Sequence, residues 1–164
     1  MTPTRIAQTY RRASRTAVPE LPWVLALTED QRRLFRERGQ FLAAGLLRHL
    51  DAPGPESAGH HLEEAAGTAV EYGRVAASLG LSLSQTVEGF LRFRMPFHQE
   101  LAVAARRRGF DTTETTDLLE AAERAMDRLL VATMSGHSPA SVSQSTRRSQ
   151  GLAPRSIRGK GREP

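Results

Sequence analysis

Three short polar sequences divide this chain into helical segments, and they constrain its fold more than any other feature. Thr28–Gln31 and Ser82–Gln85 both have the form of a capping box. In that motif the first hydroxyl accepts a hydrogen bond from the third amide of the helix, and the glutamine side chain returns the bond. Asp111–Glu114 occupies a similar position before a further helical segment. Because no stretch alternates with the period of a strand, the sequence predicts an all-α fold.

Apolar residues recur at helical spacing behind each of these starts. The pattern predicts helices over 28–50, 57–79 and 83–109, and a last helix from Asp111 onward; Ser57 is the predicted cap of the second, and Gly80 and Gly109 are the predicted stops. The predicted buried residues are Leu34, Phe35, Phe41, Leu42, Leu46, Leu62, Ala65, Ala66, Ala69, Gly73, Ala76, Leu83, Val87, Phe90, Phe97, Leu101, Ala104, Leu118, Ala122, Ala125, Met126 and Leu129.

The second predicted helix has an inner face of small residues, mainly alanine with Gly73. Small side chains allow a neighbouring helix to approach closely. We therefore expect the helix over 57–79 at the centre of the bundle.

The length of 164 residues suits one folded body with extensions. We expect a helical body over 22–134, an antiparallel or globin-like bundle of four main helices with short N-terminal helical additions. Residues 1–21 form a basic segment, with a short helix expected over 4–17. Residues 135–164 are rich in Ser, Arg, Gly and Pro and are predicted to be disordered, because they contain too few apolar residues to offset the entropy of ordering.

The net charge of +5 resides in the extensions, whereas residues 16–134 carry an excess of four acids. The body is therefore not expected to bind nucleic acid. A weak, salt-sensitive contact with a polyanion is possible through the tail, which lacks aromatic residues for base stacking. Its candidate residues are Arg147, Arg148, Arg155, Arg158, Lys160 and Arg162.

The absence of cysteine excludes disulfides and thiol catalysis and favours a reducing, cytoplasmic compartment. No signal sequence or apolar run of membrane-spanning length is present, so no membrane partner is expected. The sequence also contains no phosphate loop, nucleophile elbow or zinc-protease motif. We expect no catalytic residues, no cofactor and no enzyme activity.

Arg94 and Pro96 interrupt the apolar face of the third predicted helix. A buried arginine needs a partner, which is either an internal acid such as Glu71 or Glu88, or an anionic group in an interface. Pro96 removes a backbone hydrogen bond and is expected to kink the helix near Arg92.

Two groups of histidines raise the question of a cofactor. His98 lies near the edge of the apolar face, where a haem ligand can sit, but no second histidine opposes it. His60 and Glu64 are four residues apart, yet neither a di-iron nor a zinc pattern is complete. We therefore expect a half-buried His98 without haem, and no metal site.

The run Glu71–Arg74, followed by Gly80–Leu83 and Phe90–Arg94, resembles the N-terminal sensor domain of RsbR-type stressosome regulators. The resemblance covers about residues 20–134, and similar modules open some PucR-like bacterial transcription regulators. It implies a dimeric, globin-like bundle without haem that acts as a signalling input. It also implies that Phe90, Phe93, Arg94 and Phe97 belong to the core or to an interface, with Tyr72 and Gly73 on the close-packing face.

Two features differ from that family. Its members normally continue into an output domain, whereas this sequence continues into the basic tail, and Pro96 is not expected there. The sequence therefore predicts a cytoplasmic regulatory or sensory domain that works through protein–protein contacts, as a homodimer with a separate output partner. The alternatives are a nucleic-acid-associated regulator that uses its basic termini, and a ligand- or haem-binding sensor.

Overall fold

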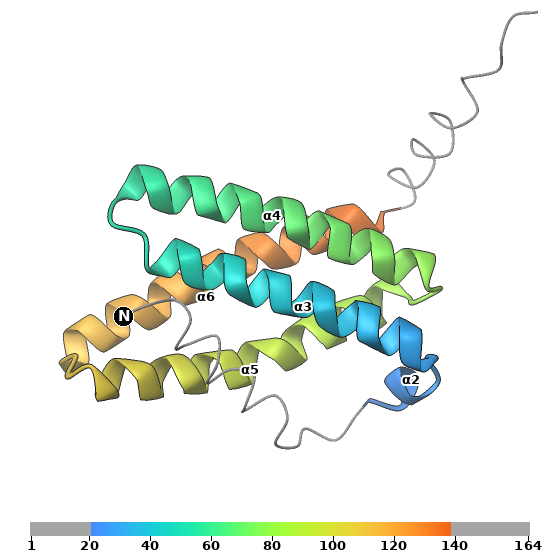
Figure 1. The fold of residues 1–164 in the computed structure, drawn as a ribbon, viewed down its shortest axis with the longest axis horizontal. Coiled ribbons are helices and arrows are strands. Elements are labelled where there is room, and N and C mark those ends of the chain that lie inside the picture. Colours follow the sequence, from blue (N-terminus) through green and yellow to red (C-terminus); the bar gives the residue numbers. More distant parts are fainter. Residues whose placement is uncertain (1–20, 139–164) are drawn as a thin grey trace, which may run out of the picture.

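The computed structural model describes residues 21–138, and every element in that range is an α-helix. The predicted all-α fold is therefore confirmed. Successive long helices run in opposite directions, so α4 and α6 point the same way (Figure 1). The elements are α2 (Pro22–Leu25), α3 (Glu29–Leu50), α4 (Pro55–Ser78), α5 (Leu83–Arg107) and α6 (Thr112–His137). The helix expected over 4–17 and most of the tail lie outside the described residues.

The helix starts at Thr28, Ser82 and Asp111 are the predicted ones. Each of these side chains accepts from the third amide of its helix, at 3.2, 3.1 and 2.8 Å. Gln31, Gln85 and Glu114 complete the boxes by accepting from the cap amides. Gly80 and Gly109 follow α4 and α5 with φ of 77° and 75°, a conformation that glycine adopts without strain.

Two predicted boundaries were wrong. Helix α4 begins at Pro55 with Gly54 as its N-cap, not at Ser57, because proline is well suited to the first turn of a helix. Helix α6 continues to His137, beyond the expected end of the body at residue 134. Tertiary contacts explain this extension: Gly136 is buried beside the backbone of Val70, and Nε2 of His137 lies 2.7 Å from the carbonyl oxygen of Leu81.

Helix α4 makes its most extensive contact with α6 and also packs along α3, but it scarcely touches α5, so it is not the central helix that the sequence analysis expected. In a square bundle these two helices would be a distant diagonal pair. Here glycines allow their backbones to touch: a Cβ atom on Gly73 would lie 2.0 Å from the carbonyl oxygen of Thr133. The buried core around this contact comprises Leu42, Leu46, Leu47, Ala65, Ala69, Tyr72, Phe90, Phe97, Leu101, Ala122, Ala125, Met126 and Leu129.

Two residues predicted to be buried are exposed: Phe41 is 59% exposed and Leu83 is 42% exposed. The buried face of α3 runs through Leu42, Leu46 and Leu47, which lie about 100–140° of rotation away from Phe41. Leu83 is the first residue of α5, directly after the N-cap Ser82, and the buried face of the helix begins at Thr86. Pro96 lies within α5, which stays helical on both sides of it.

None of the helices over 21–138 combines the length and the hydropathy that a bilayer-spanning helix requires.

Candidate functional site

Most of the family-derived candidate residues lie in the core. Tyr72, Phe90 and Phe97 are at most 4% exposed, and Gly73 is buried in the contact between α4 and α6. Phe93 is partly buried and stacks on Phe97, with 5.4 Å between ring centroids. These five residues therefore stabilise the body and leave little surface for a partner.

Arg94 pairs with acids of α6, not with Glu71 or Glu88 as the sequence analysis suggested. Its guanidinium forms an ion pair with Glu123, and its Nη2 lies 3.5 Å from Oδ1 of Asp127. The Arg94 side chain is 27% exposed. Glu88 instead accepts a hydrogen bond from Trp23, at 2.9 Å. Arg94, which interrupts the apolar face of α5, thus joins α5 to α6 within one chain.

His98 lies beside the same acid. Its Nε2 is 3.1 Å from Oε2 of Glu123, although the two are not aligned as a hydrogen bond, and within residues 21–138 this nitrogen has no hydrogen-bond partner. Burial, followed by the positive charge of Arg94, lowers the pKa of His98 below its usual value. Because Arg94 already neutralises Glu123, that carboxylate does little to hold a proton on the imidazole. His98 therefore faces an ion pair of its own chain.

The lowered pKa of His98 makes stability depend on pH. The unfolded chain takes up the His98 proton near pH 6.5, before the folded chain does, so the free energy of unfolding falls as the pH drops below that value. We expect His98→Gln to reduce the loss of stability between about pH 7.5 and about pH 5.5. Denaturant titrations at both pH values measure it. His60→Gln, at a largely exposed side chain, is the control. If the two variants lost the same free energy of unfolding between these pH values, His98 would not be the source of the pH dependence.

A row of apolar side chains on the outer surface of α5 is the most unusual feature of the described surface. Leu83, Val87, Leu91 and Met95 follow one another at intervals of four residues, and we call this row the α5 stripe. Leu83, Leu91 and Met95 are 42%, 43% and 67% exposed. Large apolar side chains grouped on a surface commonly mark a binding site.

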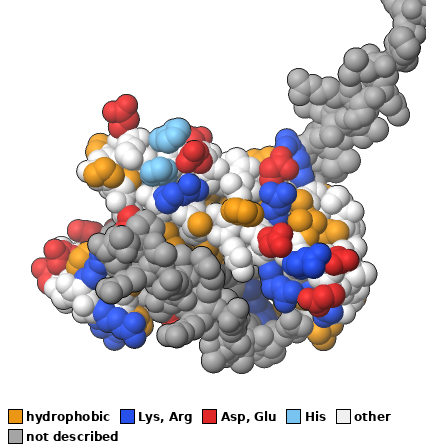
Figure 2. Space-filling model, viewed as in Figure 1, with side chains coloured by type: hydrophobic (Ala, Val, Ile, Leu, Met, Phe, Trp, Pro, Cys, Tyr) orange, Lys and Arg blue, Asp and Glu red, His pale blue; other side chains and the backbone are white. Residues whose placement is uncertain are grey.

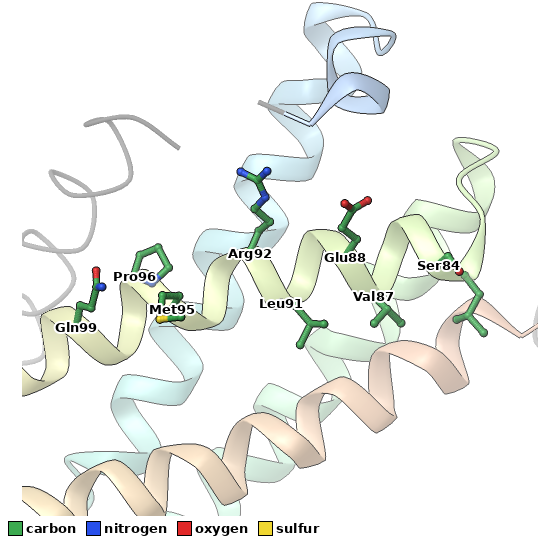
Figure 3. Close-up of a pocket in the computed structure, with 9 residues that line it drawn as sticks. Ser84, Val87, Glu88, Leu91, Arg92, Met95, Pro96 and Gln99 are labelled. Carbon is green, nitrogen blue, oxygen red and sulfur yellow. The ribbon is translucent and has the colours of Figure 1, made fainter. Parts of the chain in front are cut away.

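The α5 stripe forms one edge of an open pocket of about 740 Å³, whose described lining comes entirely from α5. In Figure 3, Glu88 and Arg92 point to one side of the helix, while Val87 and Leu91 point to the other. The pocket therefore has an apolar edge and a charged edge. Pro96 also lines it.

The other exposed large apolar side chains of the described residues are Leu25, Phe41, Val131 and Met134. Acidic and basic side chains are interspersed on the face shown in Figure 2. Among residues 21–138, no three His, Asp or Glu side chains are grouped as metal ligands would be. His60 and His61 share the single carboxylate of Glu64, at 3.7 and 3.3 Å. The tail residues Arg147 to Arg162 lie outside the described residues.

Leu91 and Met95 were not among the residues that the sequence analysis singled out, because the dominant apolar face of α5 passes through Phe90 and Phe97. The four-residue spacing from Leu83 to Met95 is the signal that identifies them.

Comparison with protein-family models, with curated proteins and with solved structures finds no match to this chain. The function is therefore argued from the α5 stripe.

Proposed function

We propose that this chain is a non-enzymatic regulatory or sensory helical domain that acts through protein–protein contacts, as a homodimer joined through the α5 stripe. The exposed apolar row Leu83, Leu91 and Met95 is the observation that supports this function. The resemblance to RsbR-type sensor domains points to the same class, a bacterial, cytoplasmic input module with a separate output partner.

A second copy is a suitable occupant because the stripe is self-complementary. When two α5 helices pair antiparallel about an axis level with Gly89, Leu83 lies level with Met95 of the second copy, and Val87 lies level with Leu91. In this register Glu88 also comes within a turn of Arg92 of the second copy. Apolar groups thus meet apolar groups, and opposite charges lie at the rim.

A charge placed within the stripe tests this function. Leu91→Asp is expected to weaken dimerisation about 100-fold or more, because each copy then buries an unpaired carboxylate. Sedimentation equilibrium over a range of concentrations measures the dissociation constant, and circular dichroism checks that the helices persist. Phe41→Asp is the matched control, since Phe41 is similarly exposed but lies on α3. Dimerisation that survives Leu91→Asp would rule out the α5 stripe as the interface.

A further inference from the structure

The described chain begins at the charged edge of the pocket along α5, beside Glu88. Leu21 is buried, and the indole Nε1 of Trp23 donates to Oε2 of Glu88, at 2.9 Å. The Trp23 ring also lies against Gly89, where an added Cβ would be 3.3 Å from it. Residues 1–20 are therefore joined to a fixed point at the charged edge of the pocket, across α5 from Leu91 and level with it to within one helical turn.

The sequence of residues 1–20 is chemically suited to this surface. Its apolar residues Ile6, Tyr10, Ala13 and Ala17 share one helical face by their spacing. The segment has four arginines and one acid, a net charge of +3, whereas residues 21–138 hold thirteen arginines against sixteen acids, a net charge of −3. Apolar pattern and charge thus both complement the body.

The segment is also long enough. The pocket runs from Leu83 to Gln99, a distance of about 24 Å along the helix axis. Twenty residues span about 30 Å even when helical. From its tether beside Gly89, the segment reaches either end of the stripe.

We propose that residues 1–20 dock in cis on the α5 stripe and compete there with a second copy of the chain. A short tether gives the segment an effective concentration on the order of millimolar, well above the micromolar concentration at which a second copy is usually present. The segment then occupies the stripe by default, and its release permits association. The competition rests on the proposed function, whereas the docking itself does not.

Thiol labelling tests the docking directly, because the chain has no natural cysteine. The thiol of the M95C variant is expected to react with a maleimide about tenfold more slowly in the full chain than when I6D and Y10D are added, since protection scales with the docked fraction. The protection is expected to be independent of protein concentration. The F41C variant, on exposed α3 surface, provides the reference rate and is expected to be the same in both backgrounds.

The outcomes separate the two proposals. At a chain concentration too low for a second copy to bind, equal labelling of the M95C thiol with and without I6D/Y10D overturns the docking. Protection that grows with protein concentration also overturns it, because a second copy then covers the stripe, and the proposed homodimer is supported. If the protection is independent of concentration, the docking is supported. If, in addition, no dimer forms with or without I6D/Y10D, the proposed homodimer is wrong.

Discussion

Gly73→Ala is expected to lower the free energy of unfolding by about 3 kcal/mol, as overpacking in a tight contact does. The new Cβ would lie 2.0 Å from the carbonyl oxygen of Thr133 and 2.8 Å from the amide nitrogen of His137. Both atoms are backbone and cannot turn aside, so α4 and α6 must separate. Denaturant unfolding followed by circular dichroism measures the change.

Gly67→Ala is the matched control on the same helix. Gly67 is exposed, and a Cβ there meets nothing within 4 Å. Alanine is expected to raise the free energy of unfolding by about 0.5–1 kcal/mol, through its greater helix propensity. If both substitutions stabilised the protein alike, the close contact between α4 and α6 would be wrong.

Phe97→Ala is expected to lower the free energy of unfolding by about 4 kcal/mol, because it removes a large side chain that is 2% exposed in the core. The cavity also deprives Phe93 of its stacking partner. The same denaturant titration applies, and a loss of less than about 1 kcal/mol would show that this position is not in the core.

Phe41→Ala provides the comparison for the same chemical change on the surface. Because Phe41 is 59% exposed, the loss is expected to stay below about 0.5 kcal/mol. The sequence analysis placed Phe41 in the core, so equal losses at the two positions would favour that interpretation over the structure.

The sequence was sufficient where the determining contacts are local. The caps at Thr28, Ser82 and Asp111 bond only to residues three positions away, so their identity alone predicts the helix starts. The glycine stops at Gly80 and Gly109 are equally local. The close approach of another helix to α4 also followed from sequence, because its row of small residues is useful only in such a contact.

The sequence was insufficient where the contact partner is distant along the chain. Arg94 pairs with Glu123 of α6 and not with Glu71 of α4, because α6 is the helix that lies beside this part of α5. The order of residues along the chain does not show which of the two helices lies there. The end of α6 depends on contacts of Gly136 and His137 with α4 and the loop after it. Local propensity disfavours a helix at Gly136, but tertiary packing outweighs it.

The candidate site was harder to predict because α5 carries two apolar faces. Phe90, Phe97 and Leu101 define the buried face. Leu91 and Met95 lie about 100° away from Phe90 and about 160° away from Phe97, respectively, on a face that faces solvent. Sequence alone ranks the stronger face first, and only the packed bundle shows that a second one remains uncovered by the other described helices.

The most direct test of the α5 stripe as a self-association surface is the solution mass of the I6D/Y10D chain over the micromolar range, compared with the same chain carrying L91D. The account predicts that the first approaches twice the 18.0 kDa of one chain as concentration rises, and that the second stays at 18.0 kDa. A mass of 18.0 kDa for both at every concentration, or equal association of both, would contradict it.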